Sequence, residues 1–90
     1  MEMLLTEELK TLRMLLDKSL NAHIFTEAVM QIGFKVIRED LMGLKMENEN
    51  GVLMLGVFRS IHPTNIGTLV YFDKDTSQTT CLVDGGKKQY

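Results

Sequence analysis

The pair Asn50-Gly51 stands between two stretches rich in apolar residues, and this arrangement restricts the fold more than any other feature of the chain. A type I′ β-turn needs two consecutive residues with positive φ, and Asn-Gly is a pair that commonly supplies them. With these two residues as the turn, Glu49 would lie opposite Val52, and the register of a whole hairpin would follow. The sequence therefore predicts an antiparallel hairpin around this pair.

The predicted hairpin, with strands over about 41–48 and 52–59, has two unlike faces because side chains alternate along a strand. One face is apolar throughout and is assigned to the core: Met42, Leu44, Met46, Leu53, Leu55 and Val57. The other face mixes small, charged and apolar residues: Gly43, Lys45, Glu47, Val52, Met54, Gly56 and Phe58. Residues 52–58 are thus apolar on both sides, a pattern typical of strands that are covered on both faces.

The first third of the chain has the spacing of amphipathic helices. Leucines recur every three or four residues along one stripe, which comprises Leu5, Leu9, Leu12, Leu16 and Leu20. Thr6 can cap the start of this helix, Asn21 suits a break after it, and a second apolar set ends at Gly33, a common terminator. We expect helices over about 6–20 and 23–32. A single bent helix is the alternative, because nothing at the junction forbids continuation.

Residues 34–41 fit either a strand or the stripe of another helix. Val36 and Ile37 are β-branched, which favours a strand. Gly33 before the segment and Gly43 after it argue against a long helix. A strand is therefore the favoured prediction, with the helix kept as the alternative.

The chain beyond the central hairpin predicts a loop and a second hairpin. Residues 59–66 contain Pro63, which denies the backbone a donor and suits a loop. Strands are expected over 67–73 and 78–84, joined by a polar turn. Residues 85–90 have little to bury and are expected to form a mobile tail.

These elements predict one α+β domain over residues 1–84, followed by the mobile C-terminal tail at 85–90. The expected architecture is two N-terminal helices packed on one face of a four- or five-stranded antiparallel β-meander. Ninety residues provide for one core. That core is expected to join two sets of residues, Leu9, Leu12, Leu16, Phe25 and Val29 from the helices with Leu44, Met46, Leu53, Leu55 and Val57 from the hairpin.

Composition narrows the class of protein. Ten Lys and Arg stand against twelve Asp and Glu, a net charge of −2 without a basic cluster, so the sequence does not favour nucleic acid as a partner. No apolar run approaches the ~18 residues that cross a bilayer, and the first residues lack a signal-peptide pattern. We therefore expect a cytoplasmic protein that does not enter a membrane. A viral protein made inside a host cell would have the same composition.

Potential metal ligands lack the spacing of a site. His23, His62 and Cys81 are far apart in sequence, whereas zinc ligands usually come in closely spaced pairs. Asp73 and Asp75 resemble the start of a calcium loop, but the glycine and the final glutamate of that loop are missing. We expect no bound metal.

Candidate catalytic groups are equally isolated. Cys81 lies within a predicted strand without cationic neighbours and is expected to behave as a small apolar residue. Glu39 and Asp40 are adjacent carboxylates with no substrate site between them. Gly85-Gly86 precedes two lysines but lacks the strand-to-helix context of a phosphate loop. We expect no catalytic residues, no cofactor and no enzymatic activity.

The remaining signal is the mixed face of the hairpin, which two helices on one side cannot cover. We predict a small non-catalytic protein-interaction or regulatory protein, of the phage or prophage accessory type, that forms a homodimer or binds a larger protein. Its predicted interface is Val52, Met54, Phe58, Lys45 and Glu47. The methionines of the hairpin suit adaptable contacts, although they equally suit gap-filling in a small core.

A small-ligand-binding regulatory sensor domain is the alternative function. Its pocket would lie between the helices and the sheet, near Tyr71, His62 and Arg59. Tyr71, Phe72 and Arg59 could form a platform for stacked bases, but such a platform would need more interleaved basic residues than the sequence provides.

Overall fold

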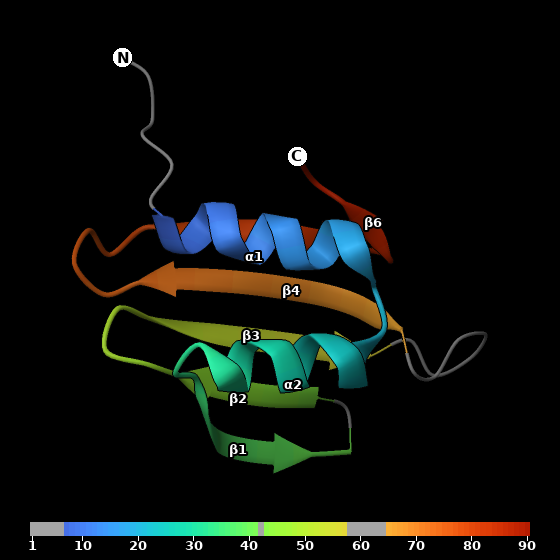
Figure 1. The fold of residues 1–90 in the computed structure, drawn as a ribbon, viewed down its shortest axis with the longest axis horizontal. Coiled ribbons are helices and arrows are strands. Elements are labelled where there is room, and N and C mark those ends of the chain that lie inside the picture. Colours follow the sequence, from blue (N-terminus) through green and yellow to red (C-terminus); the bar gives the residue numbers. More distant parts are fainter. Residues whose placement is uncertain (1–6, 42, 58–64) are drawn as a thin grey trace.

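The computed structural model describes residues 7–41, 43–57 and 65–90, and within them two helices precede six strands. The elements are α1 (Glu7–Lys18), α2 (Ala22–Gln31), β1 (Lys35–Asp40), β2 (Gly43–Glu47), β3 (Gly51–Val57), β4 (Ile66–Asp73), β5 (Thr79–Asp84) and β6 (Lys87–Lys88). All six strands form one antiparallel sheet (Figure 1). The predicted α+β class with an antiparallel sheet is confirmed, and the sheet has more strands than the four or five expected.

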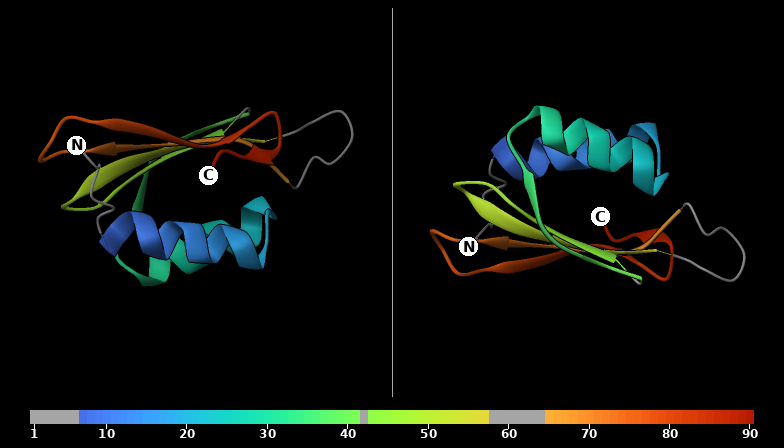
Figure 2. Two further views of the ribbon diagram at one scale, coloured as in Figure 1. Left: turned by 90° about the horizontal axis from the view of Figure 1, so that it is seen from above. Right: turned by 90° about the horizontal axis from the view of Figure 1, so that it is seen from below.

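The strands lie in sequence order from β1 to β6, so each strand pairs with the next one along the chain. Both helices lie on the same side of this sheet, with α1 in front of the β4–β5 half and α2 in front of the β2–β3 half (Figures 1 and 2). We call the side that carries the helices the inner face and the opposite side the outer face. The turns between these elements determine which segments of the chain pack on the inner face and which side chains point to the outer face.

The two helices are separate, because Asn21 starts the second one. Its side-chain oxygen accepts a hydrogen bond from the backbone N–H of Ile24 at 3.0 Å, as in a helix N-cap. At the other end Gly33 has φ +106°, and the N–H of Phe34 donates to the Val29 carbonyl at 3.1 Å. This is a Schellman ending, with Phe34 packed back into the core. The single bent helix is therefore wrong.

The core lies between the helices and the inner face. Eight of the ten predicted core residues are buried, and the other two, Leu44 and Val57, are partly buried against them. The second hairpin, Phe34 and the start of α2 contribute the rest: Ala22, Phe34, Ile66, Leu69, Tyr71, Leu82 and Val83. Within residues 34–41, Lys35–Asp40 form β1 with one bulge, which supports the favoured strand over the alternative helix.

The central hairpin has a different register from the predicted one. Glu47, two residues earlier than Glu49, lies opposite Val52. A shift of two leaves each residue on its predicted face, because the side-chain period of a strand is two. The predicted type I′ turn at Asn50-Gly51 is wrong, since neither residue has positive φ.

Two contacts explain that turn. The side-chain oxygen of Asn48 accepts hydrogen bonds from the N–H groups of Asn50 at 2.9 Å and Gly51 at 2.8 Å. These bonds place the turn before Gly51 instead of at the Asn50-Gly51 pair. Gly51 then belongs to β3, where the ring of Tyr71 from the neighbouring strand packs over it. A Cβ added to Gly51 would lie 2.5 Å from that ring, so glycine is needed for this approach.

The segment predicted as a mobile tail contains β6. Asp84 pairs with Lys87, and Gly85 and Gly86, with φ of +58° and +77°, form the two-residue turn between them. Positive φ at both positions is the type I′ geometry that the sequence suggested for Asn50-Gly51. The Gly-Gly pair thus forms a hairpin turn.

The C-terminal residues after this turn lie against α1. The ammonium of Lys88 donates to the Asp17 carboxylate at 2.9 Å, and the hydroxyl of Tyr90 lies 3.0 Å from the same oxygen. The guanidinium of Arg13 lies 4.8 Å from the centre of the Tyr90 ring. Hydrogen bonds from Lys88 and then Tyr90 lower the pKa of Asp17, whereas burial and then Asp17 raise the pKa of Tyr90 to about 12. The segment therefore packs on the helical side of the sheet and not on the outer face.

Candidate interaction surface

The outer face carries four apolar side chains side by side on the two central strands. Val52 lies opposite Phe72, and Met54 lies opposite Val70. Their chain neighbours point to the inner face and are buried, so these four point outward. We call Val52, Met54, Val70 and Phe72 the outer strip.

The outer strip is only partly shielded. Met54 is 45% exposed, and the other three side chains are half-buried by one another and by their neighbours in the sheet. Neither helix lies on this side, and β6 turns away from it (Figure 2). Of the described residues, none forms a second layer over the strip.

Charged residues border the strip on one side, and a threonine and a cysteine border it on the other. On β2, Lys45 lies opposite Met54 and Glu47 lies opposite Val52. On β5, Thr79 lies opposite Phe72 and Cys81 lies opposite Val70. An apolar centre with a polar border is the composition expected of an interaction surface.

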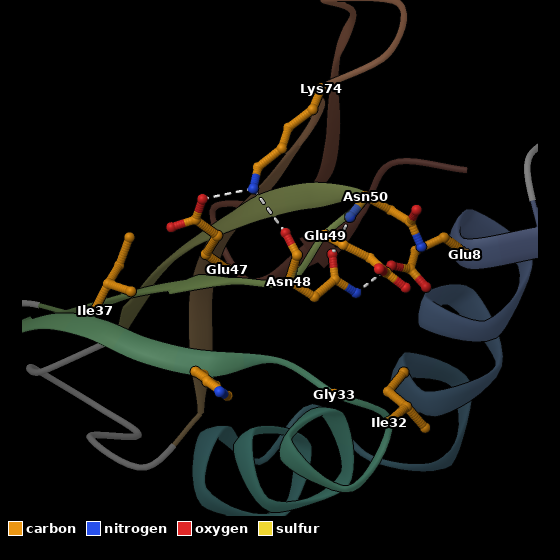
Figure 3. A pocket seen from close by; sticks show the side chains of 10 residues that line it. Glu8, Ile32, Gly33, Ile37, Glu47, Asn48, Glu49, Asn50 and Lys74 are labelled. Carbon is orange, nitrogen blue, oxygen red and sulfur yellow. Dashed lines mark hydrogen bonds and ion pairs between the residues drawn. The ribbon is translucent and has the colours of Figure 1, made fainter.

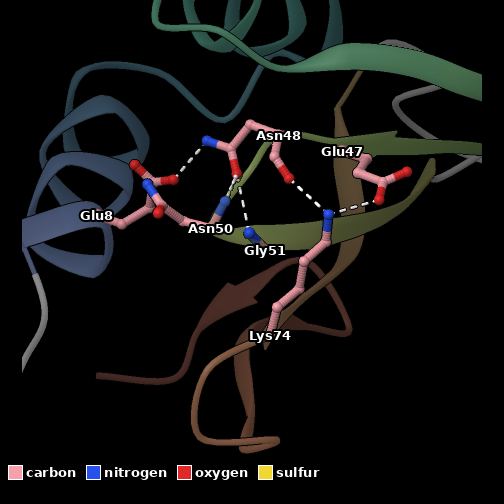
Figure 4. Close-up of polar contacts among 6 residues, drawn as sticks. All are labelled: Glu8, Glu47, Asn48, Asn50, Gly51 and Lys74. Atoms are coloured by element: carbon pink, nitrogen blue, oxygen red, sulfur yellow. Dashed lines mark hydrogen bonds and ion pairs between the residues drawn. The ribbon is translucent and has the colours of Figure 1, made fainter.

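Of the two charged residues on β2, Glu47 forms an ion pair and Lys45 does not form one with another described residue. The ammonium of Lys74 lies 2.5 Å from a carboxylate oxygen of Glu47, and this hydrogen bond lowers the pKa of Glu47 (Figure 4). Lys74 also donates to the backbone oxygen of Asn48 at 2.8 Å. Lys45 is exposed, and no ion pair joins it to another described residue.

A hollow of about 550 Å³ adjoins the strip where two glycines face each other across β2 and β3. Gly43 is opposite Gly56, and the absence of two side chains leaves a depression between Arg38 and Thr68. A Cβ at Gly43 would lie 2.0 Å from the Leu55 carbonyl oxygen, so the close approach of these strands requires glycine there.

The predicted interface residues are brought together in part. Val52, Met54, Lys45 and Glu47 all lie on the outer face, as predicted, while Phe58 lies outside the described residues. Sequence reasoning did not place Val70 and Phe72 beside them, although both alternate with apolar residues in β4. Only the pairing of β3 with β4 reveals that they continue the surface.

The other candidate groups are dispersed. His23 is on α2 and Cys81 is on the outer face, so the sheet separates them. Asp73 accepts the N–H groups of Asp75 at 2.8 Å and Thr76 at 3.2 Å and so forms a turn. Over 7–41, 43–57 and 65–90, no three His, Cys, Asp or Glu residues are grouped as ligands for one metal ion.

The two rings proposed for a stacking platform lie on opposite faces of the sheet. Tyr71 points to the inner face, whereas Phe72 points to the outer face, so the two rings cannot share a platform. His62 and Arg59 lie outside the described residues.

Comparison of the chain with models of known protein families, with curated proteins and with solved structures finds no significant match. None of the described helices is long and apolar enough to cross a lipid bilayer. The geometry of the surface is therefore the basis for a functional proposal.

Proposed function

We propose that this protein is a small non-catalytic interaction protein that self-associates through the outer strip. The observation that carries the proposal is a contiguous apolar strip on a sheet face that the described chain leaves uncovered. Single exposed apolar residues are ordinary, but a contiguous group bordered by polar residues marks an interaction site. The proposal includes the phage or prophage accessory class and a cytoplasmic setting, which the small size and the single free cysteine fit.

A second copy of the chain is the partner that this pattern fits best. Consider a two-fold axis that lies between two outer faces and crosses the strands at the level of Met46 and Leu53. Met54 of one copy would then face Val52 of the other. The same axis brings Lys45 of one copy opposite Glu47 of the other, so that charges and apolar groups are both self-complementary.

The proposal is tested by sedimentation velocity over a wide range of protein concentration. We expect the wild-type protein to form dimers and Met54→Glu to remain monomeric, because a dimer would bury two unpaired carboxylates at its centre. Met14→Glu is the matched control, since Met14 is 58% exposed on α1, on the other side of the sheet. A monomeric wild type, or a Met54→Glu protein that dimerises equally well, would overturn the proposal.

Cys81 gives an independent measurement, because it is the only cysteine and lies on the outer face opposite Val70. Its rate of reaction with a thiol reagent should fall as the wild-type protein is concentrated and dimers form. In Met54→Glu the rate should be independent of concentration. Equal behaviour of the two proteins would contradict association through this face.

A further inference from the structure

Two positively charged side chains lie side by side on the outer face. Arg38 on β1 is directly opposite Lys45 on β2, and both are exposed. Like charges in a cross-strand pair repel each other, so this pair is destabilising unless an anion approaches it. No ion pair joins Arg38 or Lys45 to a carboxylate in the described parts of the chain. An anion from a second molecule would relieve this repulsion.

The same two cations stand at the hollow formed where Gly43 faces Gly56, which we call the glycine hollow. Its volume is about 550 Å³, and its lining extends from Arg38 on β1 to Thr68 on β4. Asp40 also lines it, and its carboxylate accepts a hydrogen bond from the N–H of Gly43 at 3.1 Å. Because the two glycines have no side chains, a side chain of another molecule can approach the backbone of the sheet beside the cations.

The tip of the β2–β3 hairpin, residues 48–50, lies at the end of the sheet opposite to Gly43 and carries Glu49 (Figures 1 and 3). Glu49 is exposed and takes part in none of the ion pairs between described residues. The backbone of the tip is held by the Asn48 side chain and by the N–H of Lys74, which donates to the Asn50 carbonyl at 3.0 Å. A well-fixed turn therefore presents an exposed carboxylate.

The two-fold axis considered above places this tip over the glycine hollow of the second copy. The axis crosses β2 at Met46, and Gly43 and Glu49 lie three residues from it on either side, so Glu49 lies over the partner's Gly43. Three residues span about 10 Å. Packed sheets cross at about 30°, which displaces the tip by about one strand spacing. Since the lining of the hollow comes from four strands, β1 to β4, the tip remains above it.

We infer that Glu49 of one copy enters the glycine hollow of the other and forms an ion pair with Arg38. This inference rests on the self-association proposed above. In the same dimer Lys45 faces the partner's Glu47, so the two cations of one copy meet two carboxylates of the other. Stacked sheets lie about 10 Å apart, a gap that the long side chains of Arg38 and Glu49 span together. Two-fold symmetry repeats the pair at the other end of the outer strip, so each copy completes the hollow of the other.

Reversal of each charge tests the ion pair. Arg38→Glu and Glu49→Arg should each weaken dimerisation about tenfold in sedimentation velocity, because each dimer loses two surface ion pairs. Both variants should fold, since Arg38→Glu places an acid opposite Lys45 and Glu49 is an exposed turn residue. Glu27→Arg is the matched control, because it makes the same charge change at an exposed position of α2 on the other side of the sheet. It should leave the dimer affinity unchanged.

A mixture of the two variants is the sharper test, because the contact joins different copies. A heterodimer of Arg38→Glu with Glu49→Arg has opposite charges at both ends, the two new residues at one and the native Arg38 and Glu49 at the other. We expect it to form about tenfold more tightly than either variant dimer. Native mass spectrometry with one variant isotopically labelled measures all three dimers in one sample. A statistical mixture, in which the heterodimer has no advantage, would overturn the inference.

The outcomes separate this inference from the proposed function. A monomeric wild-type protein would overturn both. A dimer that Met54→Glu disrupts, but that neither charge reversal weakens, would support the outer strip as the interface and overturn the ion pair. Weakening by Arg38→Glu alone would assign the glycine hollow to a different anion and would also overturn the pairing with Glu49.

Discussion

The two faces of β3 differ in what covers them, although the strand is apolar on both. Leu53 and Leu55 point to the inner face and are buried beneath the helices. Val52 and Met54, their immediate neighbours in sequence, point to the outer face, where the strip is only half shielded. The comparison teaches that apolar character alone does not make a residue part of the core. Whether an apolar residue of β3 is buried depends on which face of the sheet the helices cover.

Truncation on the two faces is the strongest test of this comparison. Leu53→Ala should destabilise the monomer by about 2–5 kcal/mol, because it leaves a cavity in a fully buried site. Met54→Ala should cost less than about 1 kcal/mol, because the side chain is already exposed to water. Urea unfolding at low protein concentration, where association is minimal, measures both. Equal losses would mean that the outer strip is a second core.

Gly51 tests how the inner face is packed. Gly51→Ala should destabilise the protein by about 1–3 kcal/mol, because the new methyl group would overlap the Tyr71 ring. The same substitution in a Tyr71→Leu background should cost markedly less. A double-mutant cycle from urea unfolding isolates this coupling. Absence of coupling would show that Gly51 is needed for a reason other than the ring.

A substitution at Tyr90 tests whether the C-terminal segment with β6 is stably packed at the edge of the inner face. Tyr90→Phe removes one hydroxyl that lies beside Asp17 and the Arg13 carbonyl, and it should cost less than about 1 kcal/mol. Thermal unfolding compared with wild type measures the loss. Amide hydrogen exchange at Gln89, which donates to the Leu82 carbonyl, should show faster opening of β6 in the variant. Exchange as fast in the wild type as in an unfolded chain would restore the expected mobile tail.

The smallest effect expected is a dependence of the same segment on acid pH. The folded-state pKa of Asp17 is lowered from 3.8, so its contribution is present above that pH and is lost as the pH falls through the folded pKa. The Tyr90 ring signals in NMR should therefore shift toward those of a free tyrosine below about pH 3.8. In Asp17→Asn they should show no such step. A step that persists in the variant would assign the change to another carboxylate.

Local sequence patterns predicted most of the helices and strands. The leucine spacing located α1, Asn21 and Gly33 bounded α2, and two-residue alternation divided the hairpin between its faces. These signals depend on residues close together in sequence, so they are present before the chain folds. They also made Val52 and Met54 candidates for an interface, together with Lys45 on the adjacent strand.

The hairpin turns show where local patterns fail. The Asn50-Gly51 and Gly85-Gly86 pairs both suit a type I′ turn, and only the second adopts positive φ. At the first pair, the Asn48 side chain and the ring of Tyr71 act together and draw Gly51 into β3. The ring comes from twenty residues away, so no local propensity contains this information.

The sequence by itself determined the fold class, the division of β3 into two apolar faces and most of the core. Those properties follow from the spacing of apolar residues, which selects helix or strand before distant parts of the chain meet. Tertiary structure decided the register of the hairpin, the sixth strand and the union of Val70 and Phe72 with Val52 and Met54. It also brought the carboxylates of Glu7 and Glu8 on α1 to the same hollow as those of Asp73 and Asp75. These features depend on contacts between residues distant in sequence, whose geometry exists only when the sheet and helices are assembled.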